Sequence, residues 1–113
     1  MSLTTTGKNT AVEAVGAVAT LMRLYDDGGA EVLDYDGLSQ DKTISWGSAI
    51  NGTISIGSSV SFKVQAGVTL AAISFRSSDG NTEYGRDEIA VENQETYAND
   101  GTYNVTSATL TIS

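Results

Sequence analysis

ISIGSSVSFKVQAGVTLAAISFR, residues 54–76, carries the clearest structural signal in the sequence. Apolar side chains alternate with Ser, Lys and Gln on either side of the break at 57–59, and a period of two is typical of β-strands. Gln65-Ala66-Gly67 predicts a turn between two strands. The second strand is expected to place Ala71, Ile73 and Phe75 on one face and Ala72, Ser74 and Arg76 on the other. We therefore expect an antiparallel hairpin whose inner face lies on a core and whose outer face meets water.

The sequence before this hairpin predicts one short helix. Residues 10–13, Thr-Ala-Val-Glu, fit a capping box, in which the threonine hydroxyl accepts from a backbone N–H and the glutamate reaches back. A start near Thr6 fits equally well, and Gly16 is a suitable end. Because a helix this short is marginally stable alone, it must dock on a sheet. From Ala17 to Tyr25 the pattern changes to that of a strand.

Short strands and turns fill the rest of the chain. Turns are expected at 26–29, 34–37, 77–81 and 99–101, and Asn51-Gly52 is typical of a two-residue hairpin turn. Further strands are expected at 31–35, 42–46, 82–84, 86–92 and the C-terminus, with Ile44, Trp46, Ile89, Val91, Ala108, Leu110 and Ile112 facing inward. Val105 is out of phase with the last three of these residues, which predicts a bulge or a bend near Thr106-Ser107.

This spacing predicts a mainly β, antiparallel fold: a β-sandwich or a jelly-roll-like barrel with one short N-terminal helix. With 113 residues, we expect a single domain, residues 1–113, that begins with a polar segment at residues 1–9. Because the chain has no proline, its edge strands must be protected by charge, by bulges or by a partner subunit.

Net charge and missing residue types argue against several function classes. The chain has 14 acidic and 6 basic residues, a formal net charge of −8, no His and no Cys. The basic residues are scattered, so we expect no nucleic-acid partner. No apolar run approaches the roughly 20 residues of a membrane span, and the first residues lack the pattern of a secretory signal. We therefore expect no membrane partner and synthesis in a cytoplasm.

Catalysis is not expected either. Without His and Cys, the Ser-His and Cys-His nucleophile arrangements are excluded. Glu83, Asp87 and Glu88 are close in sequence, but we expect them to be exposed, where burial would not raise a carboxyl pKa. We expect no enzyme and no cofactor.

Calcium is the metal that this composition could still bind, because hard cations need only oxygen ligands. The two candidates are the acidic segments at 26–31 and 34–41, which contain Asp26, Asp27 and Glu31, and Asp34, Asp36 and Asp41. Neither matches the EF-hand loop, and ordinary Asp-Gly turns account for both segments.

The order of these segments is similar to that in a family of small bacteriophage virion proteins. Thr6-Gly7-Lys8-Asn9 leads into an Ala-rich helix, and the next strand ends in LYDDGG at residues 24–29, with Glu31 beyond. The similarity continues through Ile44-Ser45-Trp46 and is strongest at residues 59–69, SVSFKVQAGVT. The chain resembles proteins usually labelled tail fibre or minor tail protein, and it is also similar to head decoration modules. Where that family often has a Tyr-x-Arg pair, residues 32–36 hold the tyrosine and no arginine.

The resemblance implies a non-enzymatic virion structural protein, assembled in the host bacterial cytoplasm. It would dock in multiple copies, or as a homo-oligomer, on the capsid or tail surface through contacts with major capsid or tail proteins. Candidate inter-subunit contacts are an exposed strand edge and the residues Ser2, Leu3, Thr4, Thr5, Thr6 and Trp46. The alternative is a host-receptor or carbohydrate-binding adhesin module of the tail, whose stacking surface would be Trp46, Tyr84, Tyr97 and Tyr103.

Overall fold

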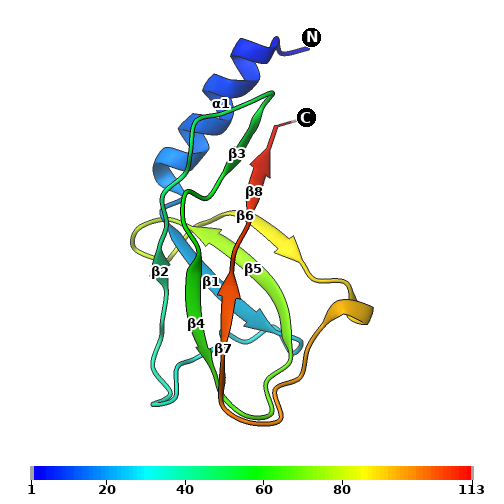
Figure 1. The fold of residues 1–113 in the computed structure, drawn as a ribbon. Coiled ribbons are helices and arrows are strands. Elements are labelled where there is room, and N and C mark those ends of the chain that lie inside the picture. The colour runs from blue at the N-terminus through cyan, green and yellow to red at the C-terminus, as the bar shows by residue number, and fades with distance from the viewer. Residues whose placement is uncertain (1, 113) are drawn as a thin grey trace.

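The chain forms two antiparallel β layers and one N-terminal helix (Figure 1). The computed structural model describes residues 2–112. The elements are α1 (Thr5–Val18), β1 (Leu21–Asp26), β2 (Lys42–Thr43), β3 (Thr53–Ser55), β4 (Val60–Val64), β5 (Leu70–Arg76), β6 (Glu83–Glu88), the 3-10 helix η1 (Val91–Asn93), β7 (Gly101–Val105) and β8 (Thr109–Thr111). The prediction of a mainly β, antiparallel, sandwich-like fold with one helix is confirmed. Over residues 2–112 the strands do not close into a barrel.

One layer is a four-stranded sheet with the order β2-β1-β5-β6. The other layer is a long two-stranded ribbon, in which β3 pairs with β8 and β4 pairs with β7. The ribbon is nearly continuous because β3 leads into β4 and β7 leads into β8 (Figure 1). Between its halves, the Ile56 N–H still donates to the Ala108 carbonyl at 3.1 Å.

The predicted hairpin of residues 54–76 is wrong, although both of its main strands exist. β4 pairs with β7 in the ribbon, whereas β5 pairs with β1 and β6 in the sheet, so the turn around Gly67 connects the two layers. Ser74 and Arg76 share the outer face of β5 as predicted, but the expectation that this face meets water is wrong. Ala72 and Ser74 are 1% and 0% exposed, so β5 is buried on both faces and belongs at the centre of a sheet.

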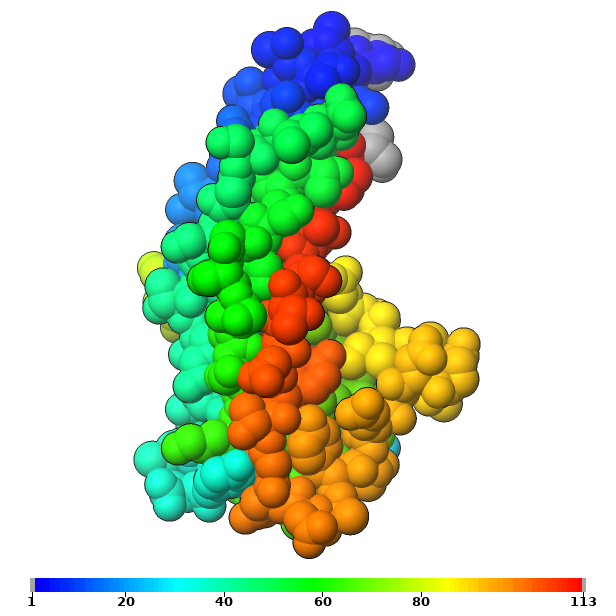
Figure 2. Space-filling model, viewed as in Figure 1, coloured from blue at the N-terminus to red at the C-terminus, as the bar shows by residue number. Residues whose placement is uncertain are grey.

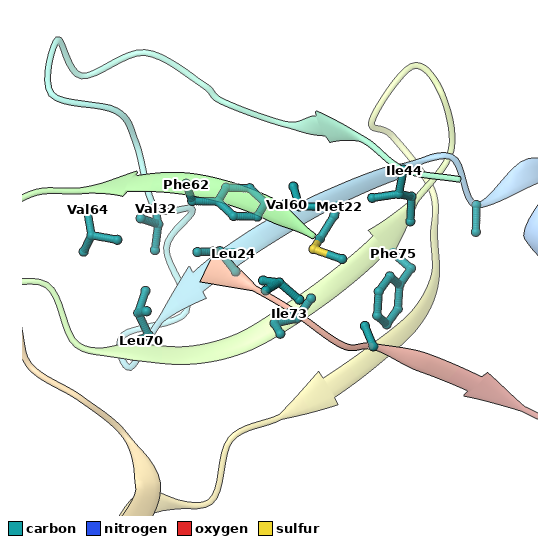
Figure 3. Packing of buried hydrophobic residues seen from close by; sticks show 13 residues of the cluster. Met22, Leu24, Val32, Ile44, Val60, Phe62, Val64, Leu70, Ile73 and Phe75 are labelled. Carbon is teal, nitrogen blue, oxygen red and sulfur yellow. The ribbon is translucent and has the colours of Figure 1, made fainter. Parts of the chain in front are cut away.

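The core lies between the two layers (Figure 3). Its largest fully buried side chains include Met22 and Leu24 from β1, Phe62 from β4 and Phe75 from β5. Burial of one such side chain stabilises the fold by roughly 1.5–3 kcal/mol. Trp46 packs edge-on against Phe75 with a centroid separation of 5.3 Å, so the core continues toward α1.

The helix is longer than the sequence predicts. Thr4 is its N-cap, with the Thr4 Oγ1 accepting from the Gly7 N–H at 3.0 Å. The helix begins at Thr5, so the predicted start near Thr6 is confirmed to within one residue, whereas the capping box at Thr10 is wrong. The helix also continues past Gly16, which is buried. A Cβ at Gly16 would lie 2.7 Å from Ile54 Cδ1, so this glycine permits close packing of α1 on β3 rather than ending the helix.

The predictions of turns are confirmed more often than the predictions of strand lengths. Asn51 and Gly52 have φ values of 53° and 78°, and Ile50 and Thr53 exchange backbone hydrogen bonds across them, as in a two-residue hairpin turn. The bend near Thr106-Ser107 is confirmed by the gap between β7 and β8.

Several predicted strands are shorter or absent. The strand at 17–25 begins at Leu21, the one at 31–35 is reduced to a single bridge between Tyr25 and Glu31, and the one at 42–46 is reduced to β2 and a bridge at Trp46. Val91 was expected to face inward but is 81% exposed in η1. With 14 residues, the α-helix found in residues 2–112 does not have the length and apolar character that crossing a membrane requires.

Candidate functional site

The outer edge of the ribbon, formed by β7 and β8, is the main candidate interaction site. Within residues 2–112, β7 pairs with β4 alone and β8 pairs with β3 alone. We call the side of these strands that faces away from β4 and β3 the β7–β8 edge. Figure 2 shows the ribbon running along the length of the molecule at its surface.

The hydrogen bonds on the far side of β4 show which backbone groups of β7 point outward. The side chain of Gln40 binds both backbone groups of Lys63: its Oε1 accepts from the Lys63 N–H at 2.9 Å, and its Nε2 donates to the Lys63 carbonyl at 2.6 Å. The backbone N–H and C=O of Lys63 therefore point away from its partner Thr102. In an antiparallel pair, the backbone groups of Thr102 and, two residues on, of Asn104 must then point away from β4. The Thr102 carbonyl accepts from the Tyr97 hydroxyl at 3.2 Å, which agrees with this direction.

The same reasoning applies to β8. Thr53 exchanges backbone hydrogen bonds with Ile50, and the Ser55 carbonyl accepts from the Gly47 N–H. The backbone groups of Thr53 and Ser55 therefore point away from β8. Their partners are Thr111 and Thr109. The N–H and C=O groups of these two threonines therefore point to the outside of the ribbon.

Apart from the Tyr97 hydroxyl on the Thr102 carbonyl, the β7–β8 edge lacks the usual protection against pairing with another strand. Residues 101–112, GTYNVTSATLTI, contain no charged residue and no proline, although the whole chain has a formal net charge of −8. Proteins commonly block such edges with Lys, Pro or an inward-pointing charge. The bend at 106–108 is the main irregularity on this edge. An unprotected edge can accept a strand from a partner.

A pocket of about 370 Å³ lies between the C-terminal half of α1 and the loop before β3. Its lining includes Glu13, Gly16 and Ala17 of the helix, with Trp46 and Ile54 opposite. Trp46 is half-buried and donates from Nε1 to the Ala19 carbonyl at 2.9 Å. Glu13 is held at the pocket because its Oε2 accepts from the Ala49 N–H at 3.1 Å. The tryptophan thus serves the core while part of it remains accessible.

The four aromatic residues of the predicted stacking surface do not form one surface. Trp46 lies beside α1, whereas Tyr97 contacts the turn around Gly67 and lies against Gly101. Tyr97 and Tyr103 are both half-buried against the core. Tyr84 is exposed, on the edge strand β6. A glycan spanning all four residues is therefore not supported by their positions.

The predicted N-terminal contact residues are accessible. Residues 2–6 are all exposed and surround the N-cap of α1, near the end of the molecule that also contains β8 (Figure 1). Leu3 is 44% exposed. Trp46 is separated from them by most of the length of the helix.

The acidic turns use their carboxylates to hold the backbone. Asp26 Oδ1 accepts from the N–H groups of Gly28 and Ala30, and Asp34 Oδ1 accepts from those of Asp36 and Leu38. The hydrogen bond from the Leu38 backbone, with that from Asp36, lowers the pKa of Asp34. Across residues 2–112, acidic side chains do not gather in groups of three that could hold a metal ion.

A charged cluster on the outer face of the four-stranded sheet was missed by the sequence reasoning. Arg23 and Arg76 both donate to the Tyr25 hydroxyl, at 3.4 and 3.1 Å, and the Arg86 guanidinium lies 4.6 Å from the centre of the Tyr25 ring. Their acidic partners are Glu31, Asp41, Glu83 and Glu88. The alternation of Arg23 and Tyr25 with Met22 and Leu24 is the signal that could have placed two members on one face.

Within this cluster, the Ser74 hydroxyl donates to Glu83 Oε1 at 2.6 Å. This hydrogen bond, together with Arg86, lowers the pKa of Glu83. Asp41 raises the pKa of Arg23. Both shifts favour the charged forms, which suits a permanent ion-pair network on the sheet.

Comparisons of this chain with protein-family models, with curated proteins and with solved structures found no match.

Proposed function

We propose that this chain is a non-enzymatic structural protein of a bacteriophage particle, which docks on the capsid or tail surface through protein–protein contacts. The observation that carries the proposal is the β7–β8 edge, whose outward backbone groups and lack of charge suit the addition of a strand from a neighbouring subunit. The resemblance of residues 6–29 and 59–69 to small virion proteins supplies the biological setting.

The chemistry of the carboxylates supports a structural role. A general acid at neutral pH needs a raised carboxyl pKa, usually from burial without a partner. Glu83 has a lowered pKa and contacts both Ser74 and Arg86. Glu13, the acidic residue in the pocket, accepts a hydrogen bond from the backbone of Ala49.

Particle composition tests the proposal. Virions purified on a density gradient from cells that produce this chain should carry it in multiple copies, and immunogold labelling should place it on the head or the tail. A chain that is abundant in the lysate but does not sediment with particles would contradict the proposal.

A pair of charge variants tests the role of the edge. Asn104→Lys with Thr111→Lys adds two charges to the β7–β8 edge, and we expect the chain to be lost from particles. Thr10→Lys with Ala14→Lys adds the same charge to exposed positions of α1 and should leave the content of the particles unchanged. Equal retention of both variants would show that docking does not use this edge.

A second candidate function, carbohydrate binding, is favoured by one observation: a half-buried tryptophan borders a pocket that also contains a carboxylate. Such a site would use the Trp46 ring and Glu13 alone, without the three tyrosines. A glycan array separates the two proposals, because a purely structural subunit should bind none of the glycans. Specific binding that is lost in Glu13→Gln would favour the second candidate.

A further inference from the structure

The geometry of β8 points to a second copy of this chain as the partner of the β7–β8 edge, paired antiparallel about a two-fold axis through Leu110. The inference rests on the proposed function, because it names the partner that binds the β8 half of the β7–β8 edge. It is tested on purified protein, so it can fail while the place of the chain on a particle stands.

The backbone of β8 can pair with itself in this register. Thr109 and Thr111 direct their N–H and C=O groups outward, because their partners Ser55 and Thr53 bind the strand segment on the opposite side of β3. About an axis at Leu110, Thr109 of one copy lies opposite Thr111 of the other. Each such pair exchanges both of its N–H···O=C bonds, as in an ordinary antiparallel sheet. Leu110, whose own backbone groups face β3, lies opposite its counterpart without a hydrogen bond.

The side chains match in the same register. Residues 108–112 read ATLTI, a near-palindrome about Leu110, so Thr faces Thr, Leu faces Leu and Ala faces Ile. The chain already contains two such cross-strand threonine pairs. The hydroxyls of Thr53 and Thr111 are 2.9 Å apart, and those of Thr69 and Thr96 are 2.6 Å apart. Opposed threonines are a favourable cross-strand pair. A two-fold axis gives both copies the same contacts, as is usual in homodimers.

Charge also favours a second copy at this position. Two chains with a formal net charge of −8 repel each other, and close approach is least costly where the contacting surface carries no charge. Residues 101–112 are such a segment. A strongly basic partner would instead be expected to meet acidic side chains along the edge, which β8 does not offer.

The extent of the contact predicts a weak dimer. The axis at Leu110 pairs β8 with β8 but leaves β7 outside the new sheet, because the bend at residues 106–108 separates β7 from β8. Such an interface is smaller than the roughly 1,200 Å² of stable complexes. We expect dissociation in the micromolar to millimolar range, of the order of 10⁻⁵ to 10⁻³ M.

Cysteine substitution tests the register, and the chain has no Cys of its own. In the dimer, residues 109 and 111 of different copies are opposite each other, whereas residue 109 lies about 8 Å from its own counterpart, too far for a disulfide. A mixture of Thr109→Cys and Thr111→Cys proteins, one of them tagged, should form the mixed disulfide under mild oxidation. Each variant alone should form little.

The matched control uses the other half of the edge. Thr102→Cys mixed with Asn104→Cys has the same spacing and the same outward backbone direction, but lies on β7. This mixture should form at least about tenfold less mixed disulfide, since β7 is outside the paired segment. Equal cross-linking of the two mixtures would indicate random collision and overturn the inference.

Sedimentation velocity between about 10 µM and 1 mM gives an independent readout. Thr111→Pro removes an N–H that points outward, and it leaves the hydrogen bonds between β8 and β3 intact. The variant should therefore fold but remain monomeric. Asn104→Pro, the equivalent change on β7, should dimerise like the wild type. A wild type that stays monomeric at the highest concentration, or a folded Thr111→Pro that dimerises as well as the wild type, would overturn the inference.

Discussion

At the scale of single residues, two small residues that look ordinary in the sequence support the packing of the helix and the charged cluster. Gly16 brings α1 against β3, and Ser74 lies fully buried beneath the charged cluster of the four-stranded sheet. Gly16 allows close packing because it has no side chain, whereas Ser74 acts through the hydrogen bonds of its hydroxyl. Neither role is visible in local sequence, because the contacting residues are distant in the chain.

Gly16→Ala should destabilise the protein even though alanine favours helix by about 1 kcal/mol. The added Cβ would lie 2.7 Å from Ile54 Cδ1 and 3.2 Å from Trp46 Cδ1, and Ile54 is only 1% exposed, so it has little space to move. Overpacking of this kind costs about 1–3 kcal/mol. We expect a net loss on the order of 1 kcal/mol in urea unfolding. Gly7→Ala, with its nearest contact at 3.4 Å, is the control and should be neutral or stabilising.

Ser74→Ala should change how stability depends on pH. The pKa of Glu83 is lowered in the folded protein by the Ser74 hydroxyl and by Arg86, so the unfolded chain binds the proton first as pH falls. The stabilisation by Glu83 is thus present above its ordinary pKa of 4.5 and is lost as pH falls through the folded pKa. The variant should lose on the order of 1 kcal/mol at pH 7, and less below pH 4.

Ser61→Ala is the control for this pH dependence. Its hydroxyl donates to the side chain of Asn104, which does not titrate, so any loss of stability should be the same at pH 7 and below pH 4. A pH-independent loss in Ser74→Ala would contradict the role assigned to Glu83. Urea unfolding of both variants at the two pH values is the measurement.

At the scale of elements, the sequence predicts strands and turns better than it predicts pairing. Alternation in β4 and the Asn51-Gly52 turn depend on neighbouring residues, and both are confirmed. The partner of β4 is β7, about forty residues later, and no local pattern specifies it. The near-continuous apolar run LAAISF at 70–75 was a usable signal that β5 is central, because a strand at a sheet surface alternates.

The candidate site was predictable only in part for the same reason. An exposed strand edge could be expected from the absence of proline, but which edge is exposed depends on the pairing of strands and on single covering side chains. Gln40 covers the β4 edge from 23 residues away and is itself only 8% exposed. No equivalent residue covers Asn104, Thr109 or Thr111 within the described part of the chain.

Gln40→Ala should therefore destabilise the ribbon. The variant leaves both the N–H and the C=O of Lys63 without their partner, and also removes the hydrogen bond to the Val32 carbonyl. Each unsatisfied buried group costs about 1–3 kcal/mol, so a loss on the order of 2 kcal/mol is expected in urea unfolding. Gln65→Ala removes one hydrogen bond, to the Asp34 carbonyl, and should cost less. Equal losses would mean that Gln40 does not protect the edge.

At the scale of the whole molecule, an elongated acidic body of 48 × 30 × 22 Å carries one uncharged edge. The helix and β3–β8 form one end, and the loops around Gly67 and Gly101 form the other (Figure 1). Net charge of one sign keeps copies apart in solution, while the uncharged edge sets where they can meet. A protein of this kind should remain soluble at neutral pH and associate when its net charge is reduced.

Acidification should make the β7–β8 edge the site of association. The isoelectric point is near 4.1, so at that pH the repulsion between copies disappears while the edge remains able to pair. Thr111→Lys should delay light scattering on acidification, because it adds a charge beside the outward backbone groups of β8. Thr10→Lys on the exposed side of α1 changes the net charge equally and should delay it less. If both variants scatter alike at equal distance from their isoelectric points, net charge alone governs association and the edge has no special part in it.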